Sequence, residues 1–149
     1  MMTQVSTKAT QTLRLIVMSL GQLTVACNIE TVYKVVKRSQ IHGSGLGLTG
    51  MIHLDGQDVI VVDLHRKLFQ VPISEKQGYF VIVKNQAADL IAIPVATSPN
   101  LMDVLREQVR ILPEAYRQSD TLDLVSHVAV VPDGEQTLTI FVLDENTLI

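Results

Sequence analysis

Short apolar runs separated by turn residues extend along most of the chain. Residues 13–20 are apolar at nearly every position, which predicts a strand buried on most of both faces. Gly21-Gln22 follows as a turn, and residues 23–29 predict a returning strand. The pattern resumes over residues 32–36 after a kink or bulge near Asn28. This order predicts an antiparallel meander.

The clearest local signal is a hairpin between residues 51 and 62. Apolar residues lead into Asp55-Gly56, a pair that accepts positive φ at both turn positions. Residues 59–62 form an apolar return strand, and Asp63 then ends it. The Asp63 side chain can cap a helical turn over residues 64–68. A first half with about five strands is therefore expected to end near residue 68.

The second half repeats this alternation of strands and turns. Residues 79–84 and 90–95 predict two strands joined by a loose turn. Residues 127–131 and 137–143 predict a last hairpin across Pro132-Asp133-Gly134. Asp144 is then a candidate cap for a terminal turn.

One segment of the second half is ambiguous. Apolar positions 101, 104, 105 and 109 fit one helical face, and Asn100 is a plausible N-cap, so pattern alone favours a short helix there. Many short strands with regular turns are otherwise typical of barrels or sandwiches. The chain is therefore expected to be mainly β, with two small barrels around a shared core and short helical turns.

Composition limits the class of protein. A chain of 149 residues buries roughly 68–70% of its surface on folding, so it needs no disulfide or metal ion to be stable. The longest apolar candidate, residues 15–20, is far below the roughly 20 residues that span a bilayer, so no membrane insertion is expected. Residues 1–11 are rich in Thr, Gln and Ser and are expected to be a disordered leader before a single domain over 12–149. A cytoplasmic location is expected, with Cys27 as a buried structural thiol.

Charge argues against a dedicated nucleic-acid binder, because the formal net charge is −3. One alternative stays open, in which two basic segments meet on a small β-barrel that binds nucleic acid. Its candidate residues are Tyr33, Lys34, Lys37, Arg38, Arg66 and Lys67.

The motifs that could carry chemistry are weak in this context. Gly45 to Gly50 spells G-x-G-x-x-G, but a hairpin rather than a helix follows, and Gln70 stands near the expected acid. His53, Asp55, Asp63 and His65 could share a metal ion, yet they fall at different strand ends. Ser126-His127 lacks an acid at a suggestive position. We therefore expect no catalytic residue, cofactor or metal ligand.

The order of these features resembles the CheW-like family of bacterial chemotaxis adaptors from Leu13 to Leu148. In that family a Gly precedes a strand, a Leu-Arg-Gly turn, a strand with an internal Pro, and an Asp-Leu followed by basic residues. Here those places hold Gly50, Leu54-Asp55-Gly56, residues 59–62 and Asp63-Leu64. Two flanking runs also match, Ile29-Glu-Thr-Val32 and Glu107-Gln-Val-Arg110 before Pro113.

The resemblance implies two five-stranded SH3-like barrels, with subdomains at about 12–70 and 71–149 and a strand rather than a helix near 101–105. It implies an adaptor without enzymatic activity that couples a histidine kinase, through the kinase's regulatory domain, to the cytoplasmic tip of a chemoreceptor. The implied partner-binding residues are Val32, Lys34, Gly50, Leu54, Asp55 and Gly56.

Several positions depart from the family pattern. Asp55 stands where Arg is usual and Lys34 where Glu is common. Ile60 replaces the usual Pro, Ala96 a frequent Asp and His127 a usual Gly. Replacing a forked cation by a carboxylate reverses local charge, and charges at an interface rim mainly set partner choice and association rate. The partner choice of this surface is therefore expected to differ from that of the family. The chain would then be a specialised adaptor or a copy that has lost kinase coupling.

Overall fold

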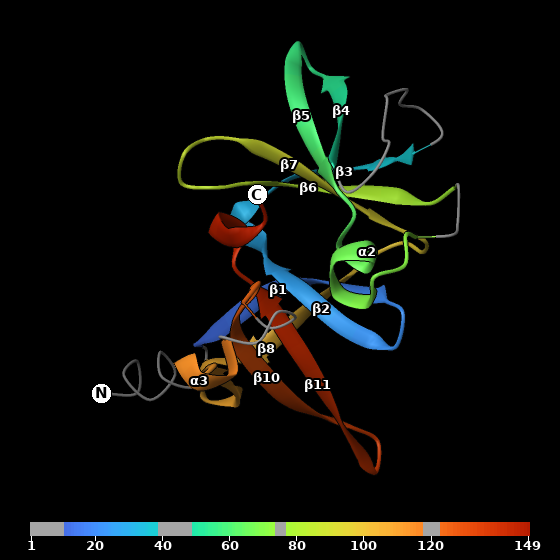
Figure 1. The fold of residues 1–149 in the computed structure, drawn as a ribbon. Helices are drawn as coiled ribbons and strands as arrows, with labels where there is room; N and C mark the ends of the chain where they lie inside the picture. The colour runs from blue at the N-terminus through green and yellow to red at the C-terminus, as the bar shows by residue number, and fades with distance from the viewer. Residues whose placement is uncertain (1–10, 39–48, 74–76, 118–122) are drawn as a thin grey trace.

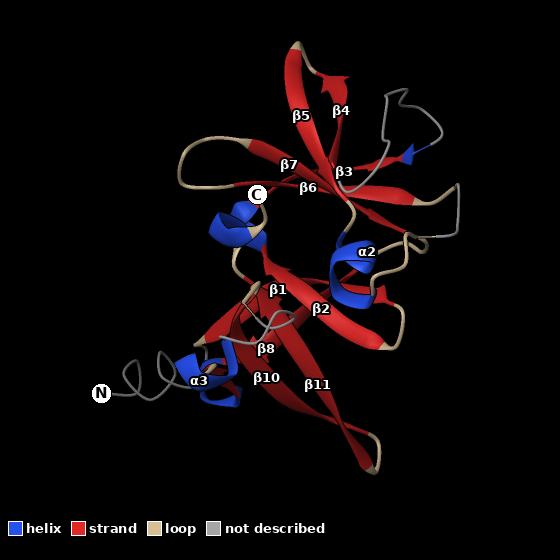
Figure 2. Ribbon diagram, in the orientation of Figure 1, coloured by secondary structure: helices blue, strands red, loops and turns tan. Residues whose placement is uncertain are grey.

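The computed structural model describes residues 11–38, 49–73, 77–117 and 123–149, and their eleven strands form two sheets (Figures 1 and 2). The first sheet has six strands in the order β8 (Asn100–Leu105), β1 (Thr12–Leu20), β2 (Leu23–Asn28), β11 (Gln136–Leu143), β10 (Val125–Asp133) and β9 (Val109–Ile111). The second has five in the order β3 (Val32–Lys37), β6 (Tyr79–Lys84), β7 (Leu90–Val95), β5 (Gln57–Val62) and β4 (Thr49–Leu54). The fold is therefore mainly β, as predicted.

Short helical segments connect the strands. They are the α-helices α2 (Leu64–Phe69) and α3 (Glu114–Arg117) and the 3-10 turns η1 (Ile29–Thr31), η3 (Arg106–Gln108) and η4 (Glu145–Thr147). No helix among the described residues is both long enough and apolar enough to cross a membrane. The predicted leader, except for Gln11, and most of the glycine motif from Gly45 to Gly50 lie outside the described residues.

A division of the strands near residue 70 was predicted, and the structure does not have it. The chain passes from the first sheet to the second at η1 and returns after β7, so the second sheet is built from strands within residues 32–95. The first sheet closes through a parallel pairing of β2 with β11, in which Val25 lies opposite Phe141. Local patterning misses such a pairing, because parallel partners are joined by long connections.

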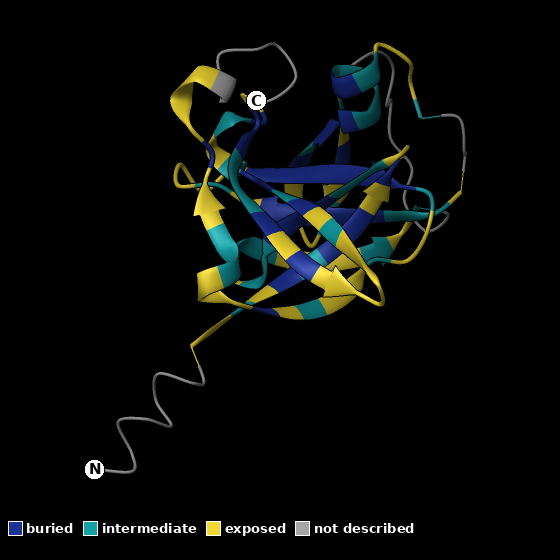
Figure 3. Ribbon diagram, turned by 90° about the horizontal axis from the view of Figure 1, so that it is seen from below, coloured by how far each residue is buried: buried dark blue, intermediate teal, exposed yellow. Residues whose placement is uncertain are grey.

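Three apolar clusters form the interior. Figure 3 shows in dark blue the buried stretches of the strands that contribute to them. One lies within the first sheet around Leu15 and Ile140, and another within the second around Val59 and Ile82. The third lies between the sheets and includes Leu64 of α2. Two barrel-like units around a shared core were predicted, and this arrangement confirms that prediction.

Turn chemistry explains the two predicted hairpins. Asp55 and Gly56 have φ of 53° and 74°, and Leu54 pairs with Gln57, so this two-residue turn is confirmed. The last hairpin forms too, but its turn is shifted. Pro132 still pairs with Thr137 inside the strands, and the left-handed position is Gly134 with φ of 64°.

The ambiguous segment is extended. It forms β8, η3 and β9, so the helix favoured by its pattern was wrong and the strand implied by the family resemblance is confirmed. Pairing with β1 decides the outcome, since Met102 lies opposite Leu15 while Leu101 and Leu105 face solvent. Tertiary pairing here overrides the local helical pattern.

Asp63 acts as the predicted cap. Its Oδ1 accepts a hydrogen bond from the Arg66 amide at 3.1 Å, and its Oδ2 accepts one from the Ile73 amide at 3.0 Å. Gln70 then ends α2 in the left-handed region with φ of 64°. Asp144 likewise accepts from the Asn146 amide at 3.1 Å and caps η4, as predicted.

Cys27 is buried in the shared core, as predicted, and burial raises the pKa of its thiol from 9.0 to about 12. The reactive thiolate is therefore scarce in the folded protein.

We expect the Cys27 thiol of the native protein to resist iodoacetamide at about pH 8 and to react fully in denaturant. Rapid alkylation of the native protein, followed by mass spectrometry, would contradict this. Because only the unfolded thiol ionises between pH 9.0 and about 12, Cys27 lowers stability as pH rises through that window.

Candidate partner-binding surface

Asp55 connects the two ends of the strand order in the second sheet. It lies in the turn between β4 and β5, whereas Tyr33 and Lys34 lie on β3 at the other end of the strand order. Lys34 Nζ lies 2.8 Å from Asp55 Oδ2, and the Tyr33 hydroxyl donates to the same oxygen at 3.0 Å. We name the exposed residues of β3 and of the β4–β5 hairpin, Tyr33, Lys34, Val35, Met51 and Asp55, the seam surface.

A bulge in β3 makes this contact possible. The register with β6 shifts between Val32 and Lys34, so consecutive residues Tyr33 and Lys34 are both exposed. In the turn, Asp55 adopts a left-handed conformation that aspartate tolerates better than most residues. Two local irregularities thus bring the three side chains together.

The charges of the seam surface stabilise one another. Hydrogen bonds from Lys34 and Tyr33 hold the pKa of Asp55 below its usual value. The same contacts raise the pKa of Lys34 and of the Tyr33 hydroxyl. Because Lys34 and Asp55 are about two-fifths exposed, the pair fixes geometry more than it stabilises the fold.

Exposed apolar side chains lie on the same strands as this pair. Tyr33, Val35 and Met51 are 39%, 38% and 49% exposed, while their neighbours Val36 and Ile52 pack into the second sheet's cluster. Aromatic residues and methionine beside a few fixed charges are typical of protein interfaces. Sequence reasoning did not select Val35 or Met51. The alternation of Ile52 and Leu54 with their neighbours was the signal that could have placed Met51 on the outer face of the strand.

The structure brings only some of the predicted partner-binding residues to the surface. Lys34, Asp55 and Gly56 are exposed, and a Cβ built on Gly56 meets no atom within 4 Å. Leu54 is partly buried against the second sheet's cluster, and Val32 against the shared core. Gly50 lies within β4, opposite Val61. Val32, Leu54 and Gly50 are therefore only partly exposed.

Several of the basic residues considered for nucleic acid already have partners. Lys34 pairs with Asp55, and Lys67 Nζ donates to the Leu148 carbonyl at 3.2 Å. The Arg38 guanidinium lies 5.6 Å from the centre of the Phe80 ring. These cations are engaged within the fold, which leaves less positive charge for a phosphate backbone.

The residues considered for a metal ion also have separate partners. His53 Nδ1 lies 3.2 Å from Asp58 Oδ1, and His65 Nδ1 lies 2.7 Å from the Val71 carbonyl oxygen. The Asp63 carboxylate accepts from two backbone amides. Within the described ranges, no group of three or more His, Cys, Asp or Glu side chains is arranged to hold a metal.

A cleft of about 570 Å³ opens on the first sheet and contains Ser126 and His127. A bulge follows Val125, and His127 Nδ1 lies 2.8 Å from Ser126 Oγ. Glu30 and Glu145 also line the cleft, but no carboxylate of the described residues bonds to His127. The acid needed to orient a catalytic imidazole is therefore not in place here.

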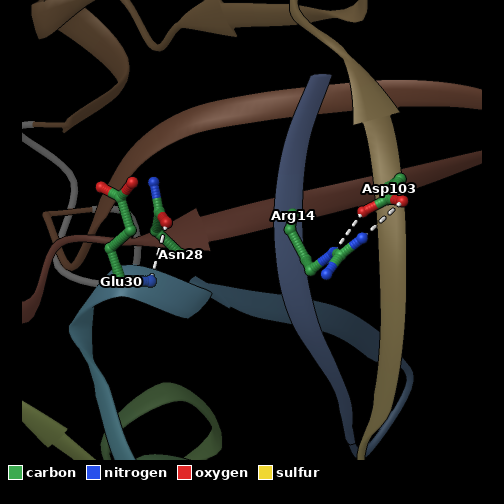
Figure 4. A network of polar contacts seen from close by, with 4 residues as sticks. All are labelled: Arg14, Asn28, Glu30 and Asp103. Atoms are coloured by element: carbon green, nitrogen blue, oxygen red, sulfur yellow. Dashed lines mark hydrogen bonds and ion pairs between the residues drawn. The ribbon is translucent and has the colours of Figure 1, made fainter. Parts of the chain in front are cut away.

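The first sheet carries an exposed ion pair of its own, well suited as a control. Figure 4 shows Arg14 of β1 beside Asp103 of β8, with Nε–Oδ1 of 2.8 Å and Nη2–Oδ2 of 3.4 Å. The same view shows Asn28, whose side chain accepts from the Glu30 amide at 3.0 Å and caps η1. Both carboxylate oxygens of Asp103 are therefore used within the chain.

Replacing Asp55 by asparagine is expected to lower the raised pKa of Tyr33. The hydrogen bond to the charged carboxylate is the main cause of that shift. The carboxylate is the acceptor, so the contact holds above the usual carboxyl pKa and is lost as pH falls through the lowered pKa of Asp55. The measurement is a pH titration of tyrosinate absorbance in the parent chain and in Asp55→Asn. Subtracting the titration of the same protein carrying Tyr33→Phe leaves the contribution of Tyr33. Asp58→Asn is the control, and an unchanged Tyr33 titration in Asp55→Asn would refute the contact.

Comparison with known proteins agrees with this fold. A family model described as CheW-like domain matches residues 14–149, and the chain therefore belongs to the CheW-like domain family. The solved structure of scaffolding protein TtCheW from Thermoanaerobacter tengcongensis is similar, with a TM-score of 0.70 and 18% sequence identity. That match covers 89% of this chain and 84% of the other. A search of curated proteins found no match.

Proposed function

We propose that this chain is a non-catalytic, cytoplasmic adaptor of chemotaxis-type signal transduction that couples a histidine kinase to chemoreceptors. Its membership of the CheW-like family supports an adaptor role in chemotaxis signalling. The observation that carries the proposal is the seam surface, where a fixed ion pair joins β3 to the β4–β5 hairpin and exposed apolar side chains lie on the same strands. Protein partners commonly recognise such surfaces.

The proposed contact residues are those that the family resemblance implied, Val32, Lys34, Gly50, Leu54, Asp55 and Gly56, together with the exposed apolar residues beside them. Lys34 and Asp55 supply oriented charge, and Gly56 leaves the turn open to a close approach. Tyr33 and Met51 supply apolar area. The partners are the regulatory domain of a histidine kinase and the cytoplasmic tip of a chemoreceptor.

The test is direct binding by isothermal titration calorimetry. Purified chain is titrated with an isolated kinase regulatory domain and with a receptor-tip hairpin from the same genome. A specific interface is expected to bury about 1,600 Å² in total, or less if it is transient. Binding to neither would overturn the proposal. Binding to an oligonucleotide that weakens steeply with salt would support the nucleic-acid alternative instead.

A matched pair of variants locates the interface. Met51 and Val130 are apolar and exposed to 49% and 47%, but Met51 lies at the seam surface and Val130 on β10 of the other sheet. Met51→Ala is expected to weaken kinase binding roughly tenfold, because it removes apolar contact area at an anchor position. Val130→Ala is expected to leave it within about twofold. Equal effects would remove the seam surface from the proposal.

A further inference from the structure

We infer that Asp55 makes the seam surface selective for a partner that places a basic side chain, preferably arginine, over the turn between β4 and β5. This inference rests on the proposed function, since it names the chemistry of the partner at the same surface. It is carried by how the Asp55 carboxylate is used inside the chain and by the charges that flank it.

Only one oxygen of Asp55 is engaged. Lys34 Nζ and the Tyr33 hydroxyl both bond to Oδ2, at 2.8 and 3.0 Å. Oδ1 has no hydrogen-bond or ion-pair partner among the residues that the structure describes. An ionised carboxylate accepts several hydrogen bonds and donates none. The open Oδ1 can therefore accept a hydrogen bond from an N–H group of a partner. The contrast is Asp103, where Arg14 occupies both oxygens.

The internal contacts also fix the direction of the open oxygen. Two donors from β3 hold the carboxylate, and the left-handed backbone of Asp55 fixes the start of the side chain. A preoriented acceptor loses less conformational entropy when a partner binds. Gly56 beside it presents no side chain that would block approach.

Flanking charge favours a cation over an anion at this turn. Asp58, on the strand that leaves the turn, is exposed and carries a second carboxylate beside His53. Among the residues that the structure describes, the lysine in contact with Asp55 is Lys34, whose ammonium already lies against Oδ2. A carboxylate of the partner would be repelled by Asp55 and Asp58, whereas a guanidinium could donate a hydrogen bond to the open Oδ1 of Asp55. The Tyr33 side chain, which contacts the same carboxylate, supplies apolar area beside the new pair.

The experiment measures binding of isolated histidine-kinase regulatory domains from the same genome to three forms of the full chain. Asp55→Asn keeps the shape of the side chain and removes its charge, and Asp103→Asn is the matched control on the other sheet. Asp55→Asn is expected to weaken binding roughly tenfold and to flatten the dependence of affinity on salt between about 50 and 300 mM. Asp103→Asn is expected to stay within about twofold of the parent chain.

A charge exchange then identifies the partner group. Asp55→Arg is expected to weaken binding more than Asp55→Asn, because the partner's basic residue now meets a like charge. In the regulatory domain, the arginine or lysine that contacts Asp55 is then replaced by aspartate. This change is expected to restore binding to Asp55→Arg and to weaken binding to the parent chain. Thermal melts of each variant check that the chain stays folded.

The outcomes separate the two proposals. If the parent chain binds a regulatory domain and Asp55→Asn binds it equally well at every salt concentration, this inference is wrong and the adaptor role stands. Tighter binding by Asp55→Arg than by the parent would also overturn it, since the partner would then be acidic at this point. If the parent chain binds no regulatory domain, the kinase-coupling role and the inference are both overturned.

Discussion

Replacing Gly78 by alanine is expected to lower the free energy of unfolding by about 3 kcal/mol or more. Gly78 has φ of 137°, a conformation that residues with a Cβ rarely adopt. A Cβ built there would lie 2.1 Å from the Val95 carbonyl oxygen and 3.0 Å from that of Ala96. Both are backbone atoms of or next to β7, so β6 and β7 would have to separate where Tyr79 pairs with Val95.

Gly134→Ala is the matched control for this substitution. Gly134 also has a left-handed φ, of 64°, but nothing lies within 4 Å of a Cβ placed there. Only conformational strain of about 1 kcal/mol is expected. Urea unfolding followed by circular dichroism measures both variants. Equal losses for Gly78→Ala and Gly134→Ala would show that the β6–β7 contact is looser than described.

Replacing Leu64 by alanine is expected to cost about 2–5 kcal/mol, the range for deleting a fully buried leucine side chain. Leu64 is 0% exposed at the start of α2 and belongs to the cluster between the two sheets. Its removal leaves a cavity that faces both barrel-like units. We therefore expect both sheets to lose stability together, rather than the second sheet alone.

Hydrogen exchange of backbone amides tests that coupling. In Leu64→Ala, amides of β6 and of β10 are expected to lose protection in parallel. Leu101→Ala, at a side chain that is 54% exposed, serves as the surface control and is expected to stay within about 0.5 kcal/mol. Loss of protection confined to β6 would mean that the shared core does not couple the two sheets.

Local signals in the sequence were sufficient for most individual elements. The Asp55-Gly56 turn, the Asp63 cap and the strand at residues 79–84 each follow from residues within a few positions of one another. These features depend on backbone preference and short-range hydrogen bonds, which a single sequence displays directly.

Long-range pairing was not predictable in the same way. The assignment of β1 and β2 to a sheet completed by the last strands depends on the contact between Val25 and Phe141, far apart in the chain. The helical pattern at residues 101–109 was misleading because β1 imposes an extended partner on it. In both cases a distant strand, and not local propensity, determines the conformation.

The candidate site shows the same division. The sequence marked Lys34 and Asp55 as two separate departures from the family pattern. The structure places their charged atoms 2.8 Å apart, so the two departures form a single contact of opposite charges. The β3 bulge and the approach of β3 to the β4–β5 turn produce that contact, and neither is visible in residue spacing.

The parallel pairing of β2 with β11 has a consequence for synthesis on the ribosome. Residues 12–28 are translated before the other strands of the described fold, yet their parallel partner β11 is translated after all of those strands. The central sheet, made from residues 32–95, has all its strands available well before that. The nascent chain therefore carries an apolar hairpin without its parallel partner while strands β3 to β10 are translated, and such surfaces are prone to aggregate and attract chaperones.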